Sequence, residues 1–285
     1  MKKAPWLNKK INLRDCRRIK THARDMAINT VCQEACCPNI SECFSRGIAT
    51  FMILGNICTR NCAFCAVKHG KPLPPDYTEP GRVREVVQSL RLKHVVITSP
   101  TRDDLVDKGA DLFYRTVLSL RSLAGVETIE VLIPDFSLDE RAITMVLAAK
   151  PDVLAHNIET VAVLYQKIRP AAIYRRSLKV LQIVKEQDKM ILTKSGIILG
   201  FGEKEEEVIE LFHDLRSVQC DFLTLGQYLQ PSLRHYPVKE YIPESVFAKL
   251  RNEALSLGFK AVMSAPYVRS SYRAGEYHIR NIARL

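Results

Sequence analysis

Seven of the nine cysteines lie between residues 32 and 65, and six of them form two triplets. The first triplet is Cys32, Cys37 and Cys43, and the second triplet is Cys58, Cys62 and Cys65. The second triplet reads C-T-R-N-C-A-F-C, which puts three thiols on one short loop after an apolar run. Soft sulfur ligands suit iron–sulfur clusters, and three of them hold three irons of a [4Fe-4S] cube while the fourth iron stays open. The iron with the open position can bind another molecule, so the cluster can take part in a reaction.

A zinc site is the competing interpretation of the second triplet. Structural zinc takes four ligands, usually from paired C-x2-C motifs, and this loop has neither a fourth cysteine nearby nor a second such pair. His69, four residues after Cys65, is the available fourth ligand. The spacing therefore favours a cluster and leaves a zinc site as the alternative.

The first triplet also makes an incomplete ligand set, with four and five residues between its thiols. Cys36 adjoins Cys37, and adjacent residues rarely both bind one metal, so we expect Cys36 to be a spare thiol. Disulfides are disfavoured, because the thiols are crowded and no secretory signal is found. Cys16 and Cys220 have no assigned role, and we expect both to be buried thiols.

The second triplet resembles the C-x3-C-x-aromatic-C signature of the radical S-adenosylmethionine (SAM) enzymes, with Phe64 as the aromatic residue. Over residues 32–70 the chain resembles the lipoyl synthase family, in the order and spacing of both triplets. The resemblance continues in V-V-I-T-S (95–99), A-H-N-I-E-T (155–160), T-K-S-G-I-I-L-G-F-G-E (193–203), L-G-Q-Y-L-Q-P-S (225–232) and R-S-S-Y (269–272). It thus covers nearly the whole chain.

This resemblance implies a sulfurtransferase that inserts two sulfur atoms, at C6 and C8, into a protein-bound octanoyl-lysine to form the lipoyl group. The implied cofactors are two [4Fe-4S] clusters and SAM. The second triplet would hold the radical SAM cluster, which cleaves SAM to a 5′-deoxyadenosyl radical. The first triplet, completed by Ser271 of R-S-S-Y, would hold an auxiliary cluster that donates the sulfur. A serine ligand binds iron weakly, which suits a cluster that is dismantled.

The middle of the chain alternates strand-like and helix-like segments, the pattern of parallel strands joined by crossover helices. The six strand candidates are residues 50–55, 94–99, 128–133, 152–156, 190–199 and 221–225. Three stripes at helical spacing are expected to be core: Val83, Val86, Val87 and Leu90; Ile173, Ser177, Val180, Leu181 and Val184; and Val208, Leu211, Phe212 and Leu215.

With the resemblance, this pattern predicts an α/β fold, a partial (β/α)6 TIM-like barrel of the radical SAM type. The barrel would occupy residues 49–265. An N-terminal extension, residues 1–48, would carry the auxiliary cluster cysteines, and a short C-terminal extension, residues 266–285, would carry R-S-S-Y.

Ligands on such barrels collect at the carboxyl ends of the strands. Asn157 and Glu159 follow the fourth strand and suit ribose hydroxyls, although Asn157 would equally suit a helix cap. Residues 196–203 end the fifth strand and match a G-x-I-x-G-x-x-E pattern that the resemblance associates with adenine. Arg176 and Lys194 are preferred for the methionine carboxylate, because a cation is needed there; Arg175 and Ser195 are further candidates. The expected SAM-binding residues are Phe64, Ser99, Asn157, Glu159, Arg176, Lys194 and Ile198.

One loop departs from the family's usual text, V-D-R-D-D-L-x-D-G-G-A. After V-V-I-T-S this chain has P-T-R-D-D-L-V-D-K-G-A, so Pro100, Thr101 and Lys108 differ. We expect backbone contacts to the amino end of the cofactor to shift here. The remaining residues keep the pattern, so we expect activity to be retained: Arg102, Asp103, Asp104 and Asp107.

The net charge of +11 and the pI near 9.2 indicate an acidic partner. Nucleic acid is disfavoured, because no recognisable motif is present and only 7% of residues are aromatic. The resemblance implies an octanoylated lipoyl carrier domain of the 2-oxoacid dehydrogenase complexes or the glycine cleavage H protein. It also implies an electron donor such as ferredoxin or flavodoxin, and an iron–sulfur carrier that rebuilds the cluster. We expect the basic surface to dock the carrier domain.

No apolar stretch approaches the roughly 18 residues that a membrane span requires, so no membrane association is expected. The first 31 residues hold nine Lys or Arg against two Asp, without a signal-peptide segment. We therefore expect a cytoplasmic location, where a reducing environment preserves exposed cluster ligands. An organelle-targeting segment is disfavoured by Asp15 and Asp25.

Three other function classes share part of this pattern. A methylthiotransferase has a loop like the second triplet but lacks the first triplet and the terminal R-S-S-Y. A redox-sensing binding module would not need Asn157, Glu159 or the glycine-rich segment. A zinc-bearing nucleic-acid protein would fit the charge alone.

Overall fold

The computed structural model describes residues 7, 21, 24–35, 37–45, 48–272 and 274–277, so Cys16 and Cys36 lie outside the described residues. By residue contacts the chain divides into two compact units. The β1–β7 unit comprises residues 11–60, 67–154 and 271–285. The β8–β10 unit comprises residues 1–10, 61–66 and 155–270.

The β1–β7 unit contains a mostly parallel sheet. In spatial order its strands are β1 (Asn29–Thr30), β2 (Thr50–Met52), β5 (His94–Thr98), β6 (Thr128–Leu132) and β7 (Val153–Ala155). Strand β1 runs antiparallel to β2, whereas β2, β5 and β6 pair in parallel. Val95, Val96 and Ile97 are fully buried, as expected for a parallel strand that is covered on both faces. Strands β3 (Ile57–Cys58) and β4 (Lys68–His69) form a separate two-stranded ladder.

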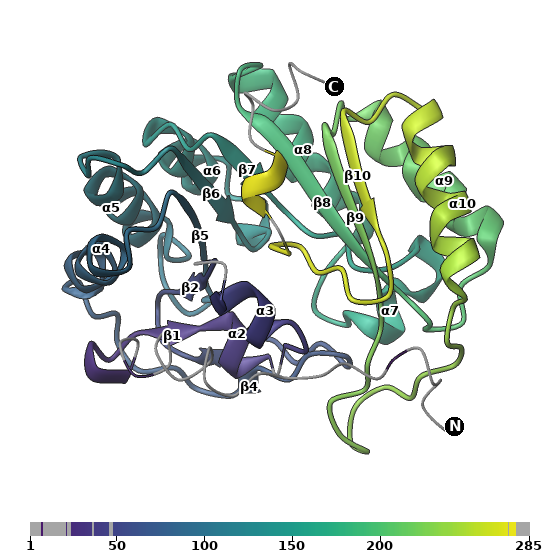
Figure 1. Cartoon of the computed structure of the whole chain (residues 1–285), viewed down its shortest axis with the longest axis horizontal. Coiled ribbons are helices and arrows are strands. Elements are labelled where there is room, and N and C mark those ends of the chain that lie inside the picture. The colour runs from purple at the N-terminus through teal and green to yellow at the C-terminus, as the bar shows by residue number, and fades with distance from the viewer. Residues whose placement is uncertain are drawn as a thin grey trace. The chain divides into compact units, whose positions relative to one another are not determined.

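Helices connect the strands of the β1–β7 unit and cover them. Their bounds are α4 (Glu79–Leu90), α5 (Ala110–Arg121) and α6 (Glu140–Ala148), and the short helices α2 (Val31–Glu34) and α3 (Ile40–Ser45) precede β2. Figure 1 shows α4, α5 and α6 in a row, and α5 contacts both of the others. The α4 stripe packs inward, with Val83, Val86 and Val87 at most 1% exposed. The 3-10 helices are η2 (Phe136–Leu138) and η4 (Ala274–Tyr277).

The β8–β10 unit has three parallel strands in the order β8 (Leu192–Leu199), β9 (Phe222–Gln227) and β10 (Ala261–Ser264). Its helices are η3 (Ala162–Leu164), α7 (Tyr165–Ile168), α8 (Tyr174–Gln187), α9 (Glu205–Ser217) and α10 (Glu244–Ser256). Ile197 and Leu199 of β8 pack in a core with residues of α9 and α10. Because side chains alternate along a strand, Lys194, Gly196 and Ile198 face the opposite side of the sheet.

The α/β class is confirmed, and a strand overlaps each of the six predicted segments, although β9 extends two residues beyond its predicted end. The strands are mostly parallel, and no closed barrel is found among the described residues. Ile173 was expected in the core and is instead 52% exposed. It precedes the first residue of α8 and has extended backbone angles, so the helical period does not reach it. None of the helices in the described ranges combines the length and apolar character that crossing a bilayer demands.

A buried ion cluster holds the start of β9 to α8 and β8. Asp221 Oδ2 lies 2.5 Å from Lys185 Nζ, and Asp221 Oδ1 lies 2.9 Å from Lys260 Nζ. The Thr193 backbone N–H also donates to Asp221 Oδ2 at 2.9 Å. Burial alone would raise the pKa of Asp221, but Lys185, the Thr193 amide and Lys260 outweigh it and hold the pKa below its usual value. The carboxylate is thus charged in the folded protein.

We predict that Asp221→Asn lowers the free energy of unfolding by about 3 kcal/mol, because it leaves Lys185 buried without its counter-charge. Urea denaturation at neutral pH measures the difference. The contribution is fully present above the unfolded-state pKa of about 4 and is lost as pH falls through the lower folded-state pKa, so the two proteins should converge in acid.

Glu127→Gln is the control, since it removes an exposed ion pair with Lys93 and should cost about 0.5 kcal/mol or less. Equal losses in the two variants would contradict a special role for Asp221.

Candidate functional site

Cys58 is the last residue of β3 in the β1–β7 unit, and backbone N–H groups contact its sulfur. The backbone N–H groups of Arg60 and Thr101 lie 3.4 and 3.3 Å from Cys58 Sγ. Its carbonyl accepts from the Gly70 N–H at 3.0 Å. His69, the alternative fourth ligand, pairs in register with Cys58, and its side chain is exposed. Two amide dipoles therefore point at the first sulfur of the second triplet.

Cys62 and Cys65 belong to residues 61–66 of the β8–β10 unit, where the loop backbone is held from two sides. The Ala63 N–H donates to Ile168 O at 2.8 Å, and Ala63 O accepts from the Tyr236 N–H at 2.8 Å. His235 Nε2 lies 3.1 Å from Cys65 O. The loop that carries these thiols is thus fixed by main-chain bonds, and both thiols are partly buried and free of disulfides.

Phe64 and Ile198, both predicted to contact SAM, lie in one apolar cluster of the β8–β10 unit. They pack against a buried group of Ile168, Phe201 and Tyr228. The Phe64 and Phe201 rings meet edge to face with centroids 6.0 Å apart. The aromatic residue of the signature therefore packs the loop against Phe201, which follows β8, and its contact with SAM stays a prediction.

The first triplet lies on and between two short helices. Cys32 is on α2, Cys43 is on α3, and Cys37 lies between them, with its N–H donating to Cys32 O at 3.1 Å. Cys32 and Cys43 are each 8% exposed. Burial, together with the negative charges of Cys37 and Cys43, raises the pKa of Cys32 to about 12. Iron displaces thiol protons when it binds, which offsets this cost.

The R-S-S-Y segment approaches the first triplet through its tyrosine. The Tyr272 hydroxyl donates to Glu42 Oε1 at 2.8 Å, across 230 residues of sequence. Glu42 lies on α3 and immediately precedes Cys43. Ser271 is half-buried and adjoins Tyr272, so a single hydrogen bond brings its part of the chain to the helix of Cys43.

The residues before R-S-S-Y are fixed against β9. The Gln227 N–H donates to Pro266 O at 3.0 Å. A Cβ at Gly226 would lie 2.0 Å from Val268 O, so this position of the L-G-Q-Y segment requires glycine. Ser270 Oγ then donates to Asn157 Oδ1 at 3.0 Å. Ser270 of the terminal motif and Asn157 of the A-H-N-I-E-T segment therefore meet within the β8–β10 unit.

Asn157 does not cap a helix, because the next helical turn, η3, begins only after Val161. It leads into a short parallel bridge with β8, in which the Glu159 N–H donates to Gly196 O and Glu159 O accepts from the Ile198 N–H, both at 2.9 Å. Glu159 has a φ of 70°, in the left-handed region that non-glycine residues rarely adopt. This strained conformation is typical of functional positions.

Arg169 supplies a positive charge next to Asn157 and Glu159, and it was not among the predicted site residues. Burial raises the pKa of Glu159, and the charges of Arg169 and Arg269, with a hydrogen bond from Asn157, oppose the rise. Arg169 is 9% exposed and its Nη1 donates to Asn157 O at 3.0 Å. Arginine is usually a surface residue, so no pattern in the sequence marks this buried one.

The remaining predicted residues differ in burial. Lys194 is 1% exposed, on the face of β8 that also carries Gly196. Arg176 lies half-buried in the first turn of α8, and Arg175 is exposed. Ser195 Oγ accepts from the Ile158 N–H at 3.2 Å, which gives it a structural role.

Ser99 directly follows β5, and its hydroxyl is buried without a hydrogen-bond partner in the described part of the chain. A buried polar group without a partner indicates a ligand or water that satisfies it. Within the β8–β10 unit, Gly196 leaves a space that a side chain would fill, since a Cβ there would lie 2.8 Å from Asn157 Oδ1 and 2.9 Å from Thr224 Oγ1. None of the six triplet cysteines forms a disulfide, which is the state that ligands of two clusters require. Among the described residues, no three His, Cys, Asp or Glu gather as a site for a single metal ion.

The loop that departs from the family lies directly beside Cys58. Thr101 O accepts from both the N–H and the hydroxyl of Thr59 at 3.0 Å. Lys108 has a φ of 56°, which favours glycine, and its Nζ donates to Asp103 O at 3.0 Å. The expected shift of contacts to the cofactor stays a prediction.

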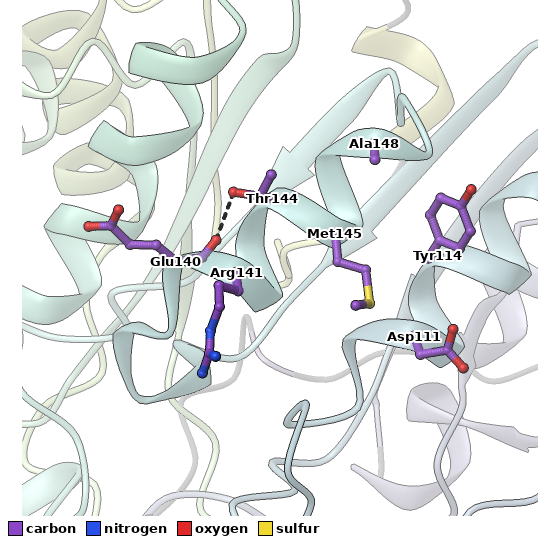
Figure 2. Close-up of a pocket in the computed structure, with 7 residues that line it drawn as sticks. All are labelled: Asp111, Tyr114, Glu140, Arg141, Thr144, Met145 and Ala148. Atoms are coloured by element: carbon purple, nitrogen blue, oxygen red, sulfur yellow. Dashed lines mark hydrogen bonds between the residues drawn. The ribbon is translucent and has the colours of Figure 1, made fainter.

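A pocket between α5 and α6 contains none of the predicted site residues (Figure 2). It is lined by Asp111, Tyr114, Glu140, Arg141, Thr144, Met145 and Ala148. The hydroxyl of Thr144 donates to Glu140 O, an ordinary bond within α6. This surface recess lies on the helices and not at the carboxyl ends of the strands, so it is not the candidate site.

Comparison with known proteins identifies the family. The Radical SAM superfamily model matches residues 52–215. The chain is 54% identical over 274 residues to the lipoyl synthase of Caldanaerobacter subterraneus subsp. tengcongensis, covering 96% of each chain. It is 53% identical over 275 residues to the lipoyl synthase of Geotalea uraniireducens, covering 96% of this chain and 97% of that one.

Solved structures share the fold. A methylornithine synthase matches with a TM-score of 0.56 at 15% identity, over 82% of this chain and 79% of that one. A maturase of the [FeFe]-hydrogenase matches with a TM-score of 0.56 at 12% identity, over 94% and 71%. With the two cysteine triplets, the R-S-S-Y segment and the similarity over almost its full length, the chain belongs to the lipoyl synthase family of the radical SAM superfamily.

Proposed function

We propose that the chain catalyses the lipoyl synthase reaction with the second triplet as the ligands of the radical SAM cluster, and with the first triplet and Ser271 as the ligands of the auxiliary cluster. The activity is the insertion of two sulfur atoms into an octanoyl group on a protein lysine. The observation that carries the ligand assignment is the Tyr272–Glu42 hydrogen bond, which brings the R-S-S-Y segment to the helix of Cys43.

The reaction explains why the site is built of sulfur ligands and not of acids and bases. An aliphatic C–H bond has no useful acidity, so a general base cannot remove its proton. When bound, the clusters and SAM supply the radical that takes the hydrogen atom and the sulfur that replaces it. The protein contributes binding, orientation and the exclusion of water.

Specific side chains would hold SAM. Glu159 and Asn157 would bind the ribose hydroxyls, and the Gly196 backbone would allow close approach of a ligand. Lys194 is buried and would face the methionine carboxylate. Arg169, beside Asn157, is a better-placed second cation than Arg176, because its contacts with Asn157 O and Tyr165 fix it there. Ser99 would donate its unsatisfied hydroxyl.

Partners and location complete the proposal. The chain acts on octanoylated lipoyl carrier domains, and its charge of +11 supports docking of an acidic one. We assign the 2-oxoacid dehydrogenase carriers or the glycine cleavage H protein as substrates, ferredoxin or flavodoxin as electron donor, and an iron–sulfur carrier for cluster repair. Free thiols at all seven described cysteines support a cytoplasmic location. The division at residues 48 and 265 stays a prediction.

The decisive test compares Cys62→Ala with Cys37→Ala in anaerobic protein given SAM, a reductant and an octanoylated carrier domain. We expect Cys62→Ala to form no 5′-deoxyadenosine, because the radical SAM cluster loses a ligand. Cys37→Ala should still cleave SAM and insert no sulfur, as scored by the mass of the carrier. Cys220→Ala is the control and should insert both sulfurs. Sulfur insertion by Cys37→Ala would refute the role of the first triplet.

Gly196→Ala should weaken SAM binding roughly tenfold, or about 1.4 kcal/mol, because the new Cβ displaces Asn157. Calorimetric titration of the anaerobic protein with SAM measures the dissociation constant. Gly81→Ala is the matched control, since a Cβ there meets nothing within 4 Å. An unchanged affinity in Gly196→Ala would remove Asn157 from the proposed site.

Tyr272→Phe should release iron from the auxiliary cluster roughly tenfold faster in the presence of a chelator, because a hydrogen bond to a charged group contributes about 1.5 kcal/mol or more. Iron release is followed by absorbance near 400 nm, after the radical SAM cluster has been saturated with SAM. Tyr77→Phe, at a residue that is 62% exposed, serves as the control. Equal rates in all three proteins would show that R-S-S-Y is not held by Glu42.

A further inference from the structure

A buried ion network anchors the residue that lies two positions after Cys58. The Arg60 side chain is 5% exposed, and its Nε and Nη2 donate to the two oxygens of Asp103 at 2.7 and 2.9 Å. Nη2 also donates to Asp135 Oδ1 at 2.7 Å, and the Asp135 side chain is fully buried. Burial opposes the charge of Arg60, but the two carboxylates outweigh it and raise its pKa. The guanidinium is thus held in one orientation.

The two carboxylates come from loops at the carboxyl ends of neighbouring strands. Asp103 follows β5 and Asp135 follows β6. Asp135 is itself placed by an unusual turn, in which Phe136, Ser137 and Leu138 have φ values of 47°, 54° and 63°. Asp135 Oδ1 accepts from the Ser137 N–H at 3.0 Å, which stabilises the turn. Such strain persists only where the surroundings enforce it, and it marks functional positions.

A second set of bonds joins the same two segments next to the sulfur. Besides the bonds from Thr59 to Thr101 O, the Asp103 N–H donates to Thr59 Oγ1 at 3.1 Å. Hydrogen bonds therefore join residues 58–60 to residues 101–103 at several positions. Between these links lie the two amides, of Arg60 and Thr101, that point at Cys58 Sγ.

Amide groups directed at a ligand sulfur stabilise negative charge on it. A [4Fe-4S] cluster becomes more negative when it is reduced, so hydrogen bonds to its sulfurs favour the reduced form and raise the reduction potential. The chemistry proposed above begins with an electron on the cluster that Cys58 would bind. The position of these two amides therefore bears on how readily that cluster is reduced.

We propose that Arg60 is a positioning residue that, through Asp103, Asp135 and the Thr59 hydroxyl, holds the amides of residues 60 and 101 against Cys58 Sγ and so makes the radical SAM cluster easier to reduce. This inference rests on the proposed role of Cys58 as a cluster ligand. Arg60, a buried residue between Cys58 and Cys62, would thus control the reduction potential of the cluster.

The test uses two variants that keep the net charge. Arg60→Lys loses the two-pronged geometry toward Asp103, and Thr59→Val keeps the branched shape but loses the hydroxyl. The midpoint potential is measured by electron paramagnetic resonance during an anaerobic redox titration of the full chain with both clusters. The radical SAM cluster is recognised because SAM changes the signal of a cluster with an open iron only. Arg141→Lys is the control, since Arg141 forms an exposed pair with Asp139.

We expect both variants to retain about eight irons per chain, the content of two [4Fe-4S] clusters. The SAM-responsive signal should shift to more negative potential in both, and the shift should be larger in Arg60→Lys. The control should match the unaltered protein. An unchanged potential in both variants would overturn the proposal, and so would loss of cluster iron in both, which would make Arg60 a folding residue only. Absence of any SAM-responsive signal in the unaltered protein would instead refute the assignment of Cys58, and the inference with it.

Discussion

A buried thiol is costly to ionise, and this cost applies to the first triplet, in which Cys32 and Cys43 are each 8% exposed. Burial and mutual repulsion raise the pKa of Cys32 to about 12, so a cation must replace the protons if the sulfurs are to be thiolates at neutral pH. The second triplet meets the same constraint differently. Cys58, Cys62 and Cys65 are only partly buried, and backbone N–H groups face the sulfur of Cys58. With the proposed clusters bound, the first triplet would need iron for its charge balance, whereas Cys58 of the second triplet also has two backbone N–H groups facing its sulfur.

The sequence was sufficient for the parts of the fold that follow periodicity. The apolar runs of β5 and β8 and the stripes of α4 and α9 are buried on the faces that their spacing predicts. Strands β1, β3, β4 and β10 were not predicted, because they are short or follow no strong apolar pattern. Periodicity gave a wrong prediction at Ile173. Helix α8 begins one residue later, so the apolar spacing placed one residue too many in the core stripe of this helix.

The residues of the candidate site divide by how they act. Cysteines and glycines reveal themselves by spacing, and the segments that carry Asn157, Glu159 and Gly196 do meet in the structure. Arg60 and Arg169 could not be found in this way, because a buried arginine depends on carboxylates or carbonyls distant in sequence. Tyr272 was visible only as part of a motif, and its partner Glu42 lies 230 residues away.

The loop that departs from the family text shows how such distant contacts tolerate change. Lys108 has the left-handed backbone that the glycine usual at this position would adopt freely, at a cost of about 1 kcal/mol. Its ammonium group contacts Asp103 O, next to the carboxylate that holds Arg60. Thr101 meets Cys58 and Thr59 through its backbone N–H and carbonyl, groups that every residue except proline provides. A changed side chain at residue 101 leaves these bonds intact, because the groups that face Cys58 Sγ are backbone N–H groups. The ion pairs of Arg60 with Asp103 and Asp135 hold that backbone in place.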